Sequence, residues 1–324
     1  MPKAAPQFLH AAFHLATERF DCLHCGDLFP QGLNAVFLSK MFHLPFLIYC
    51  HGDEVSQTDC RQFQPRVRNY IYERADFVIA ANQFAVDRLL RIGIAKNKIA
   101  KLTPGVDMKR FFPAPPRQDL IDRYGLQGHK VLLTVARLVP RKGHKVVLEA
   151  LSNVIKEMPR LKYIIAGEGP EKGNLEQLVQ NLGLQEHVIF VGNIPNAEIS
   201  NYYNLCDVFA MVNRLEIGGD IESFGMVFTE ANATGKPVIG GRSGGTDESV
   251  IDGETGFLVD PNDPQELSDR LLLLLKNGDL CLRMGTAGLH RVQSQFDWNS
   301  RALALRNIVV EVVQRFRTDT RNGQ

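Results

Sequence analysis

The sequence predicts an α/β protein built from two parallel sheets, each covered by helices. Short apolar segments rich in Val, Ile and Phe alternate with amphipathic segments of helical period. The short segments are apolar almost throughout, which is typical of strands buried on both faces of a parallel sheet. The expected strands are 46–50, 77–81, 131–136, 163–166, 188–191, 208–212, 238–240 and 256–259. The clearest helical segments between them are 145–155, 172–182 and 264–276.

Chain length and the position of a Pro-rich segment predict how these elements divide into domains. A chain of 324 residues is long enough for two domains. The Pro-rich segment Phe112–Arg117 is the best linker candidate, so we expect an N-terminal domain over 1–115 and a C-terminal domain over 116–296. Residues 297–324 should form a helix that packs back on the first domain. Before Asp21 there is room for one helix only, so the first sheet is expected to lack its initial strands.

Composition places the chain among ordinary globular proteins. It is 44% hydrophobic and 23% charged with a net charge of +1, and neither a secretory signal nor a membrane-spanning run is recognisable. A cytoplasmic location is expected, because six scattered cysteines form no disulfide framework. Cys22 and Cys25 make a lone C-x-x-C, for which two buried thiols are favoured over a redox or metal site.

Positive charge is concentrated in one segment. Residues 61–110 hold eleven Lys or Arg and four Asp or Glu, a surplus of seven in a chain whose total is +1. These charges are interpreted either as solvated helix faces or as a patch that faces anionic lipid or a phosphorylated acceptor. A nucleic-acid partner is not expected, since no aromatic residues are interleaved with the cations.

Glu222 and Glu230 form the most specific chemical feature. A helix beginning near Ser223 would present its first amides as unpaired donors, which suit a phosphate. These amides belong to Phe224, Gly225 and Met226. Glu230, two turns into that helix, could then accept hydrogen bonds from ribose hydroxyls, and Glu222 would reach the group on the phosphate's other side. Two solvated helix glutamates are the alternative.

Cations follow the expected strand 131–136. Arg137 lies where the strand ends and Lys142 opens the next helix, at the edge of a parallel sheet where ligands bind. The chain has no Asp-x-Asp motif to hold a metal, so Arg137 and Lys142 are the candidates to neutralise a diphosphate. Arg141 is expected to be solvated. No metal and no cofactor are expected.

Three further turns lie at the ends of expected strands. Gly167-Glu-Gly169-Pro170 resembles a dinucleotide fingerprint but has Lys172 at the third glycine, so nicotinamide binding is not expected. Gly240–Gly245 lines the same crevice or is a tight turn without a ligand. His51 follows the strand 46–50 and precedes a glycine and two acids, which favours a role in the site over a structural one.

Together these residues resemble the family-4 retaining glycosyltransferases, from about Phe20 to Val310. They are similar to bacterial enzymes related to phosphatidylinositol mannosyltransferases. The resemblance implies a GT-B fold, in which two Rossmann-like domains face a central cleft. Pro104-Gly-Val-Asp107 corresponds to the family's Asn-Gly-Val-Asp loop, with Pro in place of Asn.

The resemblance also implies roles for individual residues. Arg137 and Lys142 match the diphosphate-binding pair. Glu222 and Glu230 match the E-x7-E motif, whose first Glu lies by the donor sugar and whose second holds the ribose. Other matches are Gly169 in the G-x-G-P turn, Ile194 in the segment that contacts the base, and His51 near the transferred sugar.

The implied activity is metal-independent transfer of a sugar from a nucleotide diphosphate sugar to a lipid or saccharide acceptor, with retention of configuration. Peripheral contact with an anionic membrane is a further expectation. Two rival functions remain: a nucleotide-sugar-binding fragment without turnover, and a sugar-nucleotide epimerase on the same fold.

Overall fold

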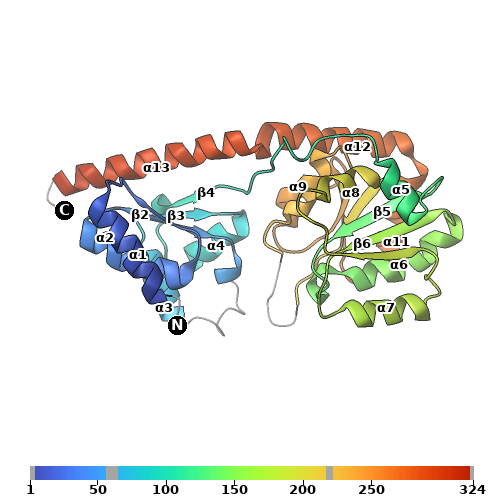
Figure 1. Cartoon of the computed structure of the whole chain (residues 1–324), viewed down its shortest axis with the longest axis horizontal. Coiled ribbons are helices and arrows are strands. Elements are labelled where there is room, and N and C mark those ends of the chain that lie inside the picture. The colour runs from blue at the N-terminus through green and yellow to red at the C-terminus, as the bar shows by residue number, and fades with distance from the viewer. Residues whose placement is uncertain (1–3, 56–64, 217–221, 322–324) are drawn as a thin grey trace. The chain divides into compact units, whose positions relative to one another are not determined.

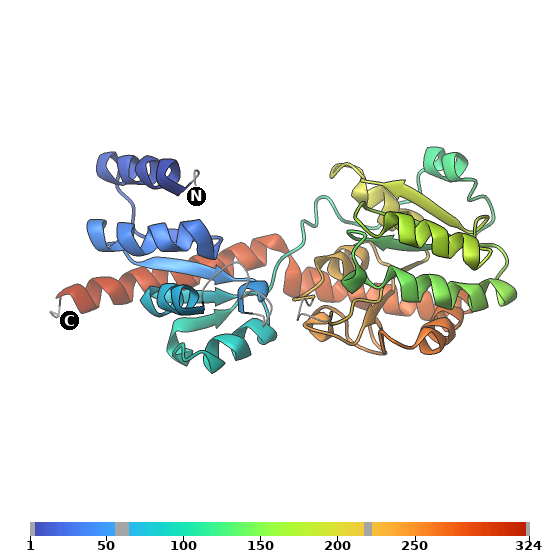
Figure 2. The same cartoon turned by 90° about the horizontal axis from the view of Figure 1, so that it is seen from below.

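The computed structural model describes residues 4–55, 65–216 and 222–321. The chain forms two compact units: unit 1 comprises Met1–Pro104 and Asn299–Gln324, and unit 2 comprises Gly105–Trp298. Each unit contains one all-parallel sheet with helices on its faces (Figures 1 and 2). The predicted α/β class with two Rossmann-like parallel sheets is therefore confirmed.

Unit 1 has a four-stranded sheet in the order β1-β2-β3-β4. Its strands are β1 (Leu23–Cys25), β2 (Phe46–Cys50), β3 (Phe77–Ala80) and β4 (Ile99–Lys101). The helices are α1 (Ala4–Thr17), α2 (Leu33–Phe42), α3 (Pro65–Arg74), α4 (Gln83–Arg91) and, from Asn299 onwards, α13 (Trp298–Arg321).

Successive residues of the strands in unit 1 point to opposite faces of the sheet and pack against the helices there. Ile48 and Val78 contribute to a core with residues of α2, α3 and α4. Leu47 and Ile79 face the other way, into a cluster with Val312 of α13. The strands are apolar on both faces because helices cover both faces.

Unit 2 has a six-stranded sheet in the order β10-β9-β8-β5-β6-β7. Its strands are β5 (Lys130–Val135), β6 (Leu161–Ala166), β7 (Val188–Gly192), β8 (Val208–Met211), β9 (Val238–Gly241) and β10 (Gly256–Val259). Its helices are α5 (Gln118–Tyr124), α6 (His144–Glu157), α7 (Lys172–Asn181), α8 (Ile199–Leu205), α9 (Met226–Ala233), α10 (Thr246–Ser249), α11 (Pro264–Lys276) and α12 (Gly278–Arg291).

In unit 2 successive strands are added on one side of β5 and then, from β8 onwards, on the other side. Strands β6 and β7 lie on one side of β5, and β8, β9 and β10 lie on the other. Loops that leave neighbouring strands in opposite directions at such a reversal form the usual ligand site of this kind of sheet. Helices α6, α7, α11 and α12 cover one face of the sheet, and α5, α8 and α9 cover the other.

All eight expected strands are present, with ends shifted by a residue or two in several cases. The apolar pattern does not predict β4, whose three residues are only partly buried or exposed. A short edge strand of this kind lacks the continuous apolar run that identifies the others.

The connection between the units lies before the Pro-rich segment. Val106 donates its N–H to the carbonyl of Phe296 at 2.7 Å, and Phe111 is buried in the core of unit 2. Gly105 is consequently the first residue of unit 2, and Phe112–Arg117 lies inside that unit. The composition of a linker does not report such backbone pairing with a distant segment.

Candidate functional site

A cavity of about 360 Å³ opens at the carboxyl ends of β5 and β6 in unit 2. Its polar lining comes mainly from the turn after β5 and from the loops after β6 and β7. The lining includes Arg137, Arg141, Lys142, Glu168, Ile194 and Val227. Arg137, Lys142 and Ile194, three residues expected at the site from sequence, are thus together at one cavity.

A tight turn positions the cations after β5. Pro140–Lys142 forms a single 3-10 turn, and Gly143 follows with φ of 71° before α6 begins. A Cβ atom on Gly143 would lie 1.8 Å from the carbonyl oxygen of Val212, so the turn packs directly on the segment after β8. Only glycine combines this close approach with a left-handed conformation.

Glu222 is held by two cations. The Lys142 ammonium and the Arg141 guanidinium both contact Oε2 of Glu222, the latter at 3.0 Å. All three side chains are at most 17% exposed. The expectation that Arg141 is merely solvated is therefore wrong. The cause is tertiary: the N–H of Arg214 donates to the carbonyl of Arg141 and holds the turn against the chain that leads to Glu222.

The helix between the two glutamates begins later than expected. Helix α9 starts at Met226, not near Ser223, because Gly225 has φ of 78° and breaks the helical conformation. The amide of Phe228 is used by the carbonyl of Gly225 at 3.0 Å. Val227, in the first turn of α9, lines the cavity, and the first amides of a helix have no acceptor within the helix.

Phe224 and Met226 differ in their surroundings. The Phe224 side chain is buried and packs edge-to-face on Phe296 at 5.6 Å between ring centroids, whereas Met226 is 42% exposed. Phe224 therefore anchors the loop before α9. Any contact of Phe224 with a ligand would have to come from its backbone.

Glu230 lies one turn into α9 rather than two, since the helix begins at Met226. Its Oε2 accepts a 2.7 Å hydrogen bond from the hydroxyl of Tyr203 on α8. Burial raises the pKa of the Glu230 carboxyl, while the Tyr203 hydrogen bond and the charge of Arg110 act in the opposite direction. Sequence patterns did not single out Tyr203.

The glycine-rich turns have visible packing reasons. A Cβ on Gly169 would lie 2.3 Å from the Leu138 carbonyl oxygen, so this loop needs glycine to pack against the turn after β5. Its neighbour Gly167, rather than Gly169 itself, belongs to the cavity lining. In Gly240–Gly245, the N–H of Gly245 donates to the carbonyl of Glu222 at 3.1 Å and so fixes the Glu222 backbone.

His51 lies in unit 1, directly after β2. Its Nε2 is 3.1 Å from the Gly26 carbonyl oxygen, and its ring stacks on Tyr49 with 6.1 Å between centroids. Its backbone N–H donates to the Glu54 carboxylate at 2.9 Å. The ring is exposed at the carboxyl edge of the first sheet, which is the ligand-binding edge of such sheets.

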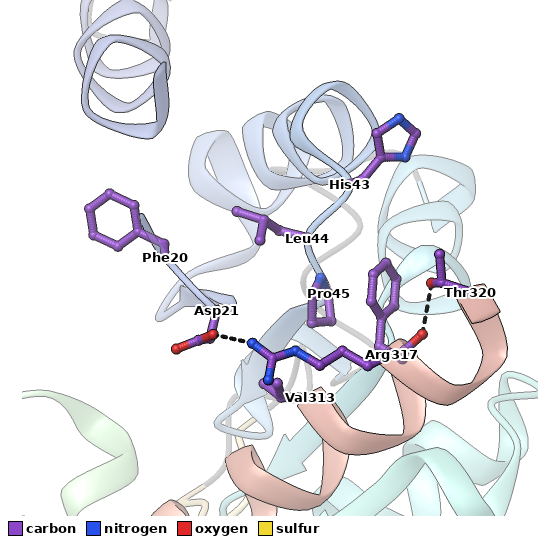
Figure 3. A pocket seen from close by; sticks show the side chains of 9 residues that line it. Phe20, Asp21, His43, Leu44, Pro45, Val313, Arg317 and Thr320 are labelled. Atoms are coloured by element: carbon purple, nitrogen blue, oxygen red, sulfur yellow. Dashed lines mark hydrogen bonds and ion pairs between the residues drawn. The ribbon is translucent and has the colours of Figure 1, made fainter. Parts of the chain in front are cut away.

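A second hollow, of about 350 Å³, lies in unit 1 (Figure 3). Apolar side chains such as Phe20 and Leu44 line it, and Arg317 pairs with Asp21 at its side. Asp21 and Pro45 precede β1 and β2, so this hollow is at the amino ends of the strands. It contains none of the residues that the sequence predicts for the site.

Within the described parts of the chain, no group of three or more His, Cys, Asp or Glu is arranged to hold a metal ion. Cys25 is buried in the core of unit 1, and burial raises its pKa to about 12. Such a thiol stays protonated, which agrees with the interpretation as a buried hydrophobic residue.

Comparison with known proteins gives two family matches. The model of glycosyl transferases group 1 matches residues 117–291, and that of Glycosyltransferase Family 4 matches residues 2–110. The chain belongs to the glycosyl transferases group 1 family. The match covers more than half of the chain and includes the whole cavity described above.

Several relatives are similar over most of the chain. A GDP-mannose-dependent alpha-(1-6)-phosphatidylinositol monomannoside mannosyltransferase of Mycolicibacterium smegmatis is 34% identical over 80% of this chain and 68% of its own length. Its namesake in Mycobacterium tuberculosis is 37% identical over 79% of this chain and 66% of its own. The aligned part of this chain thus spans about two thirds of each relative.

Solved structures support the fold. Anabaena HepE, crystallised with UDP and glucose, superposes with a TM-score of 0.78 at 23% identity, over 99% of this chain and 82% of that one. Sucrose-phosphate synthase of Thermosynechococcus elongatus gives a TM-score of 0.77 at 26% identity, over 96% of this chain and 78% of that one. The predicted GT-B fold is confirmed.

The predicted function is confirmed at the level of the family. The chain is a glycosyltransferase that uses a nucleotide sugar, with a lipid or saccharide as the acceptor class. Among the described helices, none combines the length and the apolar character needed to cross a membrane.

Proposed function

We propose that this chain transfers mannose from GDP-mannose to a phosphatidylinositol mannoside or a similar glycolipid, with retention of configuration and without a metal ion. The observation that supports this proposal is the contact of Glu222 with Arg141 and Lys142, two cations that line the cavity at the carboxyl ends of β5 and β6. The donor and acceptor follow the names of relatives that are 34% and 37% identical.

In this proposal the cations stabilise the leaving group. Arg137 and Lys142 would face the diphosphate of the donor, and the first amides of α9 would bind one of its phosphates. This arrangement supplies the positive charge that a metal ion provides elsewhere. Gly225 would allow the phosphate to approach the backbone, and its positive φ is the reason that α9 begins at Met226.

The remaining residues would bind the other parts of the donor. Glu230 would accept hydrogen bonds from the ribose, and the backbone around Gly169 and Ile194 would contact the base. Glu222 would contact the transferred sugar, and the role of His51 stays a prediction from the family resemblance. These roles rest on the family motif and on the clustering of Ile194, Lys142 and Glu222 at one edge of the sheet.

The test is turnover with radiolabelled GDP-mannose and phosphatidylinositol monomannoside in detergent, with and without EDTA. Labelled dimannoside of retained anomeric configuration, formed equally with EDTA, would support the proposal. Binding of GDP without turnover would instead identify a nucleotide-sugar-binding fragment. A changed sugar nucleotide formed without acceptor would identify an epimerase. Rescue of EDTA-treated protein by manganese or magnesium would contradict the metal-independent mechanism.

The basic surface of unit 1 supports peripheral binding to anionic membranes. Exposed cations extend from α3 and α4 to β4, and the apolar side chains of Tyr70 and Leu90, 41% and 39% exposed, lie on the same helices. The exposed cations are Arg66, Arg74, Arg91, Lys96 and Lys101. Each cation near an anionic surface contributes about 1 kcal/mol, so several together give measurable binding.

Cosedimentation with vesicles tests this membrane contact. The protein should bind vesicles that contain phosphatidylglycerol, dissociate from them at high salt, and not bind vesicles of pure phosphatidylcholine. Charge reversal by Arg91→Glu and Lys96→Glu should weaken binding, whereas Lys145→Glu in unit 2 should not. If the charge-reversed variant of unit 1 and the Lys145→Glu variant bound vesicles equally well, this surface would not be the membrane contact.

A further inference from the structure

Tyr203 is rigidly held beside Glu230. Its ring is fully buried and packs against Phe111 and Phe209, with centroid distances of 5.8 and 5.6 Å. Its hydroxyl donates to Oε2 of Glu230 at 2.7 Å. Burial also raises the pKa of the Tyr203 phenol well above its usual range, so the hydroxyl keeps its proton and can act only as a donor toward the carboxylate.

The two oxygens of Glu230 therefore have different surroundings. Oε2 accepts the bond from Tyr203, and among the described residues no hydrogen bond to Oε1 is formed. When a hydrogen bond fixes one oxygen of a carboxylate, the other oxygen points in a defined direction. The side chain needs such support, because a free glutamate has three rotatable bonds and loses their freedom when it binds a ligand.

One cation also faces this pair. Arg110 stacks on Phe111 with 4.9 Å from Cζ to the ring centroid, and its Nη2 donates to the Asn196 carbonyl. Its charge acts on both Tyr203 and Glu230 and favours the ionised carboxylate. The thiol of Cys206 also faces Tyr203, but it donates to the Tyr203 carbonyl, and burial raises its pKa to about 12, so it stays neutral.

We propose that Tyr203 is a positioning residue for donor binding, which fixes the ionised Glu230 carboxylate so that Oε1 is available to the ribose hydroxyls. This inference rests on the proposed role of Glu230 and extends it to a side chain that does not contact the donor. Tyr203 then determines how well the site distinguishes a ribonucleotide from a nucleotide without ribose hydroxyls.

The neighbouring Tyr202 provides a matched control. Its hydroxyl bonds to the hydroxyl of Tyr124 at 2.9 Å, and among the described residues it forms no hydrogen bond with Glu230. Tyr202→Phe and Tyr203→Phe each remove one oxygen from adjacent positions of α8. A general loosening of this helix would affect both variants, whereas a positioning role belongs to Tyr203 alone.

The experiment measures binding of GDP and of 2′,3′-dideoxy-GDP by calorimetry between pH 5 and pH 8; the two corresponding uridine nucleotides replace them if the wild type binds UDP instead. Wild-type protein and Tyr202→Phe should prefer the ribonucleotide by about 10-fold or more, the scale of a hydrogen bond to a charged group. Tyr203→Phe should lose most of that preference, and its residual preference should disappear at a higher pH than in the wild type, because the carboxyl loses a bond that favours its ionised form.

Glu230→Gln distinguishes the proposed ribose-binding role of Glu230 from the positioning role of Tyr203. If this variant keeps the full ribose preference, the proposed role of Glu230 itself is wrong. If Glu230→Gln loses the preference while Tyr203→Phe keeps both the preference and the wild-type pH profile, only the positioning role of Tyr203 is refuted. Parallel losses in Tyr202→Phe and Tyr203→Phe would likewise refute it, since they would indicate a shared packing defect.

Discussion

Replacement of Lys142 by alanine should separate catalysis from stability. The Lys142 ammonium contacts Oε2 of Glu222 and is only 13% exposed, so its charge acts in a partly desolvated site. If it stabilises the leaving diphosphate, its loss should lower kcat by about 10²- to 10³-fold, or about 2.7–4 kcal/mol in the barrier. The pair is also structural, but the 3.0 Å contact with Arg141 remains and keeps Glu222 paired. The cost in unfolding free energy should therefore stay below the roughly 3–5 kcal/mol that follows when a buried charge loses its partner.

The assay is mannosyl transfer at saturating GDP-mannose, with urea unfolding measured in parallel. Lys145→Ala is the matched control, because Lys145 lies three residues further on and is 63% exposed in a surface pair with Glu149. It should leave kcat unchanged. The proposed role of Lys142 would be refuted if Lys142→Ala retained kcat within about 3-fold of wild type, or if its loss of activity followed a comparable loss of folded protein.

Three further predictions concern single residues of unit 2. Burial raises the pKa of Glu230 in the folded state, so the protonated carboxyl stabilises the fold at low pH and this contribution is lost as pH rises through that pKa. Glu230→Gln removes the buried negative charge, so it should raise the melting temperature at pH 7 while it weakens nucleotide binding. Burial lowers the pKa of His144 to about 4, so the free energy of unfolding should fall as pH decreases from about 6.5 toward 4, by up to about 1.4 kcal/mol per pH unit, and His144→Gln should flatten this slope in urea titrations. Gly169→Ala should destabilise unit 2 even without ligand, because its Cβ would lie 2.3 Å from the Leu138 carbonyl oxygen; an unchanged melting temperature would contradict the packing explanation.

The sequence by itself determined the secondary structure and the class of fold. Residues 46–50, 256–259 and 264–276 have in the structure the bounds that their patterns predict. Buried strands and amphipathic helices are encoded by neighbouring residues, so a local pattern is sufficient to find them. The cationic turn after β5 was also readable, since a strand followed by Arg137 and Lys142 is a local signal.

Only the tertiary structure decided which side chains meet. Arg141 and Glu222 are 81 residues apart, and they pair because β5 lies next to β8 in the sheet. Tyr203 and Glu230 are 27 residues apart on two different helices. The start of α9 at Met226 depends on the positive φ of Gly225, a position where a Cβ would lie 2.6 Å from the Phe228 ring. Such pairings follow from strand order and close packing, and neither has a period that a single sequence displays.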